Sequence, residues 1–148
     1  MRRVKVFKVA RESEMKRVAL WLLKLKKTGT HGMVLSLTGN LGAGKTTLVK
    51  FIGKICGVDS LIVSPSFVLL RIYKGRQDIY FVHMDAWRIG KGDLAFLGFS
   101  DLLKNPKAIV CVEWADRVKQ AMPAWSTWVK IEHISARQRK VTVSYQCE

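Results

Sequence analysis

The stretch TGNLGAGKTTL, residues 38–48, places Gly39, Gly44, Lys45 and Thr46 in the spacing G-x-x-x-x-G-K-[ST]. Glycines at these points let successive backbone N–H groups turn inward around an anion, and a helix that begins here adds the positive end of its dipole. In such a loop the lysine reaches the β and γ phosphates of a nucleotide, and the threonine hydroxyl ligates Mg²⁺. The stretch predicts phosphate binding and leaves the reaction open.

The segments around the loop supply the context that this motif requires. Residues 33–38, MVLSLT, form a short apolar run closed by Gly39, which predicts a buried parallel strand. A helix is expected to begin at about Gly44 and to run to Ile55. The order strand, loop and helix is the one in which the motif binds phosphate.

The rest of the chain predicts more strands and helices, and no interdomain linker. Apolar spacings of three and four predict an amphipathic helix over 13–27, with Ser13 as its N-cap. The other expected elements are a hairpin from 66–73 and 79–85, a short helix within 93–103 interrupted by Gly98, a strand at 108–114, and a hairpin from 127–134 and 140–146. We therefore expect a single P-loop domain over residues 1–148, an α/β fold with a mostly parallel sheet flanked by helices and extended by hairpins.

The charge of the chain is strongly positive and uneven. There are 26 Lys and Arg residues against 11 Asp and Glu residues, a net charge of +15. Residues 1–27 hold ten basic and two acidic side chains, a net charge of +8. Such a field attracts polyanions such as RNA, but a solvated basic surface explains it equally well.

The cysteines and the apolar runs bear on the cellular compartment. Cys56, Cys111 and Cys147 are odd in number and far apart, which favours reduced thiols over disulfides or a zinc site. No apolar run reaches the roughly 18 to 20 residues that span a bilayer, so we expect a cytoplasmic protein that does not enter the membrane.

Two strand-end acids are candidates for Mg²⁺ binding and for orienting a nucleophile. Glu113 ends IVCVE and Asp85 ends YFVHMD, and such acids collect at the carboxyl edge of a parallel sheet. Either acid is alternatively a structural strand-end residue. His83 shares the face of Asp85, and we interpret it as a hydrogen-bonded core histidine. Ser66 lies in a turn-like segment, either as a sensor of the γ-phosphate or as a plain turn residue.

Three other classes of protein use a phosphate-binding loop of this kind and differ in the motifs that accompany it. A GTPase is disfavoured because residues 105–108, NPKA, do not supply the guanine-binding N-K-x-D element. A small-molecule kinase needs an arginine-bearing lid, for which only the stretches 71–76 and 136–140 are available. A nucleotide-gated binding module, with incidental hydrolysis, also remains open.

Five blocks, in order, resemble the TsaE (YjeE) family of small bacterial P-loop ATPases. They are GNLGAGKTTL, SPSFVLLRIY, HMDAWRI, LAFLGFSDLL and VCVEW. The chain departs from the family pattern where Ser66 replaces a threonine, where Trp87 replaces a tyrosine, and where WAD (114–116) replaces W-P-E. The departures bear on partner contacts and turnover rate more than on ATP binding.

The resemblance implies a role for each matching residue. The ATP-binding residues would be Leu41, Gly42, Ala43, Gly44, Lys45, Thr46, Thr47 and Trp114. Thr46 and Glu113 would ligate Mg²⁺. Asp85 would be an essential acid near the γ-phosphate, and Ser66 would stand in for the switch-like threonine. Lys45, Asp85, Glu113 and Ser66 would thus form the catalytic set.

The family resemblance also implies an activity and partners. It implies a small α/β sheet with the P-loop at its centre and a weak, partner-stimulated ATPase that works with the TsaB and TsaD proteins. TsaD transfers the threonylcarbamoyl group to adenosine 37 of ANN-decoding tRNAs. On this reading the chain meets tRNA through that assembly, or through its basic N-terminal patch.

Overall fold

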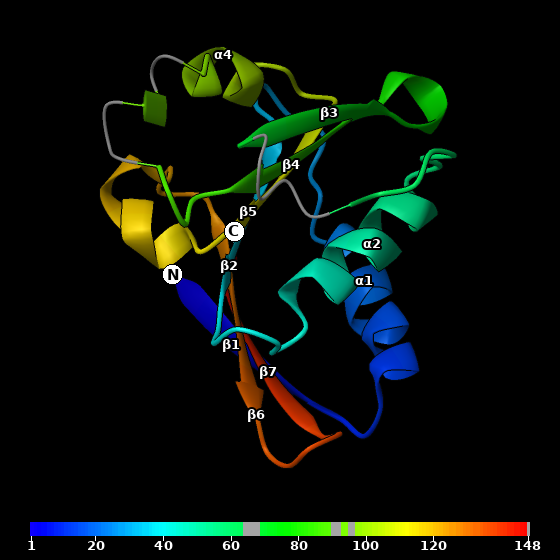
Figure 1. The fold of residues 1–148 in the computed structure, drawn as a ribbon. Helices are drawn as coiled ribbons and strands as arrows, with labels where there is room; N and C mark the ends of the chain where they lie inside the picture. Colours follow the sequence, from blue (N-terminus) through cyan, green and yellow to red (C-terminus); the bar gives the residue numbers. More distant parts are fainter. Residues whose placement is uncertain (64–68, 90–92, 95–96, 148) are drawn as a thin grey trace.

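One seven-stranded sheet organises the computed structural model, which describes residues 1–63, 69–89, 93–94 and 97–147 (Figure 1). The strands are β1 (Arg2–Val9), β2 (Met33–Thr38), β3 (Leu70–Lys74), β4 (Tyr80–Asp85), β5 (Ala108–Glu113), β6 (Thr127–His133) and β7 (Arg139–Gln146). The described helices are α1 (Met15–Leu23), α2 (Lys45–Ile55) and α4 (Phe99–Leu103), with 3₁₀ turns η1 (Glu12–Glu14), η2 (Arg76–Asp78) and η3 (Ala115–Ala121).

The sheet is parallel in its centre and antiparallel at both edges. Its strand order is β1-β7-β6-β2-β5-β4-β3, and the pairs β6–β2, β2–β5 and β5–β4 are parallel. The β3–β4 pair and the β6–β7 pair are antiparallel, as predicted for the two hairpins. The predicted α/β class, with hairpins added to a parallel sheet, is confirmed.

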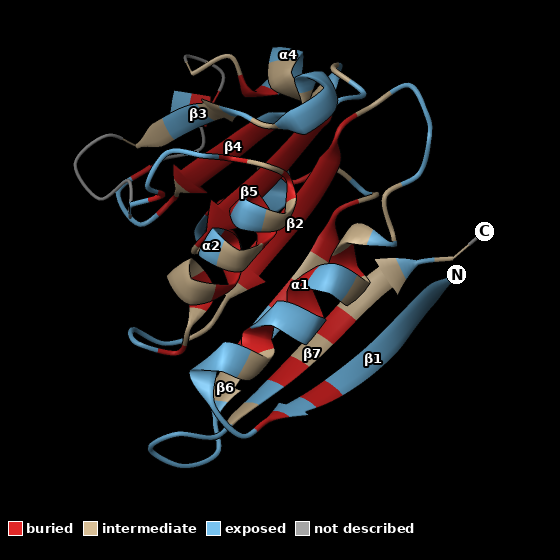
Figure 2. Ribbon diagram, turned by 90° about the vertical axis from the view of Figure 1, so that its right-hand side faces the viewer, coloured by how far each residue is buried: buried red, intermediate tan, exposed pale blue. Residues whose placement is uncertain are grey.

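The central strands are largely buried (Figure 2), and apolar side chains pack on both of their faces. Successive side chains of a strand point to opposite faces, so Leu35 packs beneath α1 and α2, whereas Val34 packs towards α4 and η3. On one side α2 contributes Ile52 to the core, and on the other α4 contributes Phe99. Each such buried side chain stabilises the fold by about 1.5–3 kcal/mol, which fixes the ends of β2, β4 and β5 relative to one another.

The N-terminal region differs from the prediction in two ways. Residues 2–9 form an edge strand that was not predicted; Phe7 and Val9 are buried against α1, while Lys8 between them and residues 2–6 before them are exposed. The helix predicted over 13–27 is shorter, from Met15 to Leu23. Ser13 does not cap it, because this residue lies inside η1 and the N-cap position is Glu14.

Other predictions about the chain are confirmed within the described residues. Gly98 precedes α4 in the left-handed region, with φ of 72°, and so interrupts the predicted helix. Cys56, Cys111 and Cys147 are free thiols. The predicted Ser66 turn lies outside the described residues. Across the described ranges, none of the helices has the length and apolarity needed to cross a bilayer.

Candidate functional site

The loop between β2 and α2 depends on glycine for its conformation. Gly39, Gly42 and Gly44 have φ values of 146°, 76° and 113°, a region that favours glycine. A Cβ atom on Gly39 would in addition collide with the carbonyl oxygen of Ile131. Since α2 begins at Lys45, the loop delivers the N-terminal N–H groups of a helix to the enclosed space, as an anion site requires.

The side chain of Lys45 is folded into this loop. It is only 5% exposed, and its Nζ donates hydrogen bonds to the carbonyl oxygens of Gly39 (2.5 Å) and Asn40 (3.1 Å). The ammonium group also lies 3.9 Å from the ring centroid of Trp114. Neutral oxygens and an aromatic face thus hold the cation. A phosphate group would be a stronger partner for the ammonium group and can replace them.

Burial and neighbouring acids act on Lys45 in opposite directions. Loss of solvent lowers the pKa of Lys45 from its ordinary value, and the carboxylates of Glu113, Asp116 and Asp85 raise it in part. A bound triphosphate would add further negative charge beside the ammonium group. Nucleotide binding therefore favours the charged lysine that phosphate recognition needs.

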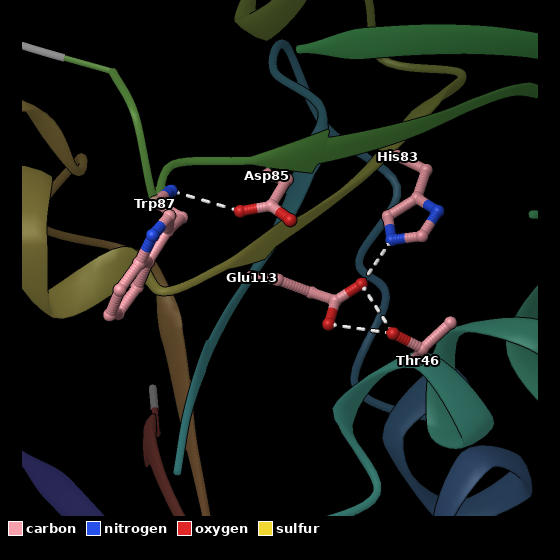
Figure 3. Close-up of polar contacts among 5 residues, drawn as sticks. All are labelled: Thr46, His83, Asp85, Trp87 and Glu113. Atoms are coloured by element: carbon pink, nitrogen blue, oxygen red, sulfur yellow. Dashed lines mark hydrogen bonds and ion pairs between the residues drawn. The ribbon is translucent and has the colours of Figure 1, made fainter. Parts of the chain in front are cut away.

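Thr46, Glu113 and His83 form a linked group at the carboxyl end of β5 (Figure 3). The Thr46 hydroxyl donates to the Glu113 carboxylate, with distances of 2.9 and 3.0 Å to its two oxygens. His83 Nε2 lies 2.5 Å from Glu113 Oε2, and the His83 side chain is fully buried. His83 is thus the hydrogen-bonded core histidine that was predicted, and it fixes the orientation of a site carboxylate.

Asp85 occupies a different part of the site. It ends β4 in register with Glu113 on β5, and its carboxylate accepts a hydrogen bond from the backbone N–H of Trp87 at 2.9 Å. Among the described residues its carboxylate makes no hydrogen bond to Thr46 or Lys45. The two strand-end acids are therefore adjacent but distinct, since Glu113 bonds the loop threonine and Asp85 does not (Figure 3).

Trp114 follows Glu113 in a left-handed backbone conformation, with φ of 57°, which is uncommon for a bulky residue. This turn brings its ring to Lys45 on one side and to Trp87, at 4.4 Å between ring centroids, on the other. The guanidinium of Arg117 lies 3.8 Å from the Trp87 ring centroid. A continuous set of contacts thus links the loop lysine to Trp87, which is 46% exposed.

A cavity of about 730 Å³ brings most of the predicted residues together. Its walls include the predicted residues Leu41, Gly42, Ala43, Gly44, Lys45, Thr46, Thr47, Asp85, Glu113 and Trp114. Cavities of this size accommodate cofactors and small ligands. Ser66, also predicted for this site, lies outside the described residues.

Four charged residues of the cavity wall were not assigned to the nucleotide site: Arg11, Glu12, Arg137 and Arg139. Glu12 accepts a hydrogen bond from the Thr47 hydroxyl at 2.7 Å, and Arg139 Nε donates to the carbonyl oxygen of Ala43 at 3.0 Å. The two residues of each contact are 35 and 96 positions apart in sequence, so no local motif predicts these contacts. The stretch 136–140, considered as a kinase lid, does reach the cavity, whereas Arg76 bonds the carbonyl of Ile55.

The donor set fits a nucleotide with Mg²⁺. A hydroxyl and a carboxylate supply hard oxygen ligands, which Mg²⁺ prefers, and this ion is usually bound by one or two protein groups together with phosphates. The loop glycines leave the space open, and Lys45 and the start of α2 supply positive charge. Thr46 and Glu113 are the residues that would hold the ion.

A buried strand, a glycine-rich loop with its lysine, a helix, and an acid on the neighbouring parallel strand define a P-loop α/β protein. The family model described as "Threonylcarbamoyl adenosine biosynthesis protein TsaE" matches residues 9–141. The chain belongs to the TsaE family.

Relatives from several bacteria agree with this assignment. The tRNA threonylcarbamoyladenosine biosynthesis protein TsaE of Treponema pallidum is 31% identical over 127 residues, which cover 85% of this chain and 92% of that protein. The protein of the same name from Nostoc is 38% identical over 98 residues, 64% of this chain and 59% of that protein. The crystal structure of YdiB from Bacillus subtilis matches the fold with a TM-score of 0.78 at 23% identity, covering 98% of this chain and 87% of that one.

Proposed function

We propose that this protein is a Mg²⁺-dependent ATPase that serves tRNA threonylcarbamoyladenosine biosynthesis together with the TsaB and TsaD proteins. Membership of the TsaE family supports the pathway. The observation that carries the ATPase is the bond of the Thr46 hydroxyl to Glu113, beside the buried Lys45 in one cavity. A cytoplasmic location follows from a tRNA-modifying role.

Each group at the site has a task in this proposal. Bound Mg²⁺ would neutralise negative charge on the β and γ phosphates, and Thr46 and Glu113 would hold it. Lys45 exchanges its bonds to the loop carbonyls for bonds to phosphate oxygens. His83 keeps the Glu113 carboxylate in one orientation, because both residues are buried and bonded. Asp85, free of Thr46, orients the attacking water.

The test is Mg²⁺-dependent ATP hydrolysis by the purified protein, alone and with TsaB, TsaD and tRNA. We expect slow basal turnover that the partners raise. Lys45→Ala should abolish it, because loss of a charged hydrogen-bonding group weakens phosphate binding about 100-fold. Lys50→Ala is the matched control, an exposed lysine on the same helix. Turnover that is indifferent to the partners but rises with an added nucleoside would instead indicate a kinase.

One observation favours a nucleotide-gated binding role beside hydrolysis. The contacts from Lys45 through Trp114 to the exposed Trp87 connect the phosphate loop to the protein surface. If partner binding follows nucleotide state, a Glu113→Gln protein should bind TsaB and TsaD with ATP and fail to release them. Normal release by that variant, measured by size-exclusion chromatography, would contradict the gated role.

A further inference from the structure

A second cavity, of about 300 Å³, lies at the opposite end of β2 from the phosphate loop. Its walls come from the segment 25–34, which precedes and begins β2, and from two other parts of the chain. Trp125 and Thr127 enter from the start of β6, and Tyr145 from the end of β7. The cavity thus brings together segments that are far apart in sequence.

The aromatic part of this cavity is held in place. The rings of His31 and Trp125 are stacked, with 4.2 Å between centroids and 27° between planes. Both bond the carbonyl oxygen of Gly32, His31 through Nδ1 at 3.1 Å and Trp125 through Nε1 at 3.3 Å. The backbone N–H of Gly32 in turn donates to Leu103 at 2.8 Å. A flat aromatic surface is therefore formed before any ligand arrives.

These bonds also define which hydrogen-bonding groups of His31 and Trp125 remain available to a ligand. A carbonyl oxygen only accepts, so Nδ1 of His31 is the donor, and in the neutral ring Nε2 is left as an acceptor. Trp125 has already used its only polar atom. The pair therefore presents ring surface, together with one ring nitrogen that can accept a hydrogen bond.

Among the described residues that line the cavity, the charged side chains have one sign. Lys26 and Lys27 line it, and none of its described wall residues is Asp or Glu. The sequence from Met15 to Val58 contains no acidic residue at all. Lys26 Nζ is fixed by a 2.8 Å bond to the carbonyl of Pro106, a neutral partner that leaves its charge uncompensated. An anionic group is therefore favoured here.

We propose that this cavity binds one nucleotide unit of RNA, with the base against the Trp125 and His31 rings and the phosphate near Lys26 and Lys27. Stacking on aromatic side chains beside a basic groove is how proteins hold unpaired nucleotides. An acidic peptide would use the lysines and leave the aromatic surface idle. A volume at the lower end of the range for small-ligand sites suits a single unit.

The same chemistry is offered by a free mononucleotide, and direct binding separates the two sources. Fluorescence anisotropy would follow a labelled single-stranded RNA of about ten nucleotides, a length within the usual site sizes, and separately labelled AMP. Both titrations use the full chain at about 0.15 M salt without ATP, which would compete for the second cavity, and a repeat with Lys45→Ala removes any contribution of the phosphate loop. Tighter binding of RNA than of AMP identifies RNA as the source, and binding of AMP alone identifies a free nucleotide.

Five variants test the geometry. Trp125→Leu should weaken binding about tenfold or more, the loss expected for one stacked base, whereas Trp125→Phe keeps a ring and should retain affinity. His31→Ala removes the stacking partner of Trp125 and should also weaken binding. Lys27→Glu should weaken binding, and Lys50→Glu, an exposed charge reversal on α2, should not. Thermal melts identify any variant that fails to fold.

Several results would overturn the proposal. One is the absence of binding to both RNA and AMP by the wild-type protein. Another is equal weakening by Lys27→Glu and Lys50→Glu, which would mean that overall charge alone attracts RNA. Displacement of RNA by polyglutamate as readily as by unlabelled RNA would have the same meaning. Because Lys45→Ala should leave this binding unchanged, its outcome is independent of the proposed ATPase.

Discussion

The two ends of β2 carry opposite kinds of site. At its carboxyl end the cavity wall contains the carboxylates of Glu12, Asp85 and Glu113 beside Lys45, whereas at its amino end the described wall of the second cavity contains lysines and aromatic rings and no acid. Parallel strands end together, so strand-end acids gather on one edge. One end of the sheet thus carries the groups for the proposed metal-assisted reaction, and the other carries those for the proposed attraction and stacking of a nucleotide.

The largest effect is expected from removing the negative charge of Glu113 at the carboxyl end of β2. Glu113→Gln should lower ATP turnover about 10²- to 10³-fold, the size of the loss when a charge-stabilising group is removed from a catalytic site. The matched control is Glu132→Gln, an acid on β6 paired with Lys130 at the surface, which should leave turnover unchanged. Steady-state hydrolysis measures both. Equal activity of the Glu113 and Glu132 variants would contradict the assignment of the site.

Two glycine substitutions compare the change in stability caused by an added methyl group at the two ends of β2. Gly39→Ala should destabilise the fold by roughly 3 kcal/mol, because φ of 146° and the Ile131 carbonyl leave no room for a methyl group. Gly29→Ala, in the wall of the second cavity, meets no atom within 4 Å and should change stability by less than about 0.5 kcal/mol. Urea unfolding measures the difference, and similar values for both would show that the phosphate loop is not strained by a side chain.

Substitution of the buried His83 tests how far metal binding depends on the residue that orients the Glu113 carboxylate. His83→Ala should weaken Mn²⁺ binding to the nucleotide complex about 10- to 100-fold, because residues that orient metal ligands have effects of this size. His83→Gln retains a donor and should recover part of the affinity. Electron paramagnetic resonance measures Mn²⁺ binding directly. Unchanged binding in a folded His83→Ala protein would make the histidine a packing residue only.

The smallest effect concerns the reactivity of two thiols that lie away from the phosphate loop, Cys56 after α2 and Cys147 after β7. Burial raises the pKa of Cys56 from 9.0 to about 11, and Arg76 and Lys26 oppose this shift. At pH 8 Cys56 is protonated, so a thiol reagent should label Cys147, next to the second cavity, first. Because thiolate is the reactive form, the rate at Cys56 should rise about tenfold per pH unit until the pH approaches its pKa.

Mass spectrometry of the labelled peptides separates the two cysteines. Labelling of Cys56 that is as fast as labelling of Cys147 at pH 8 would contradict the burial of Cys56. Unfolding the protein in urea is the control, since it should expose all three thiols. ATP in the phosphate loop should leave labelling of Cys147 unchanged, whereas RNA in the second cavity should slow it.

The central elements of the fold were predictable because their signals are local. The apolar run of β2 and the glycine spacing before α2 define the phosphate loop without outside information, and β5 matched its predicted strand to within one residue. Strand β1 was missed although basic and apolar residues are interleaved in RRVKVFKV, because so many charges are equally typical of a solvated basic surface. Ser13 failed as a cap because a 3₁₀ turn absorbed it.

The site was predictable only where residues follow strands of the central sheet. Lys45 and Thr46 were identified from the loop motif after β2, Asp85 and Glu113 from their places at strand ends, and the structure brings all four to one cavity. The contacts of Glu12 with Thr47 and of Arg139 with Ala43 depend on how η1 and β7, which are distant from the loop in sequence, pack against it. The His31–Trp125 stack also joins positions 94 residues apart, which no spacing rule reveals.

Strand β1 has a consequence for how copies of this protein behave in concentrated solution. It lies at the end of the sheet and, in the part of the chain that the structure describes, pairs only with β7, so its outer backbone groups can meet another strand. Val4 and Val6, 65% and 47% exposed, would favour such stacking. The alternating Arg and Lys side chains oppose it, because like charges on two approaching edges repel. The positive charge of this strand thus also acts as a safeguard against aggregation through the open edge.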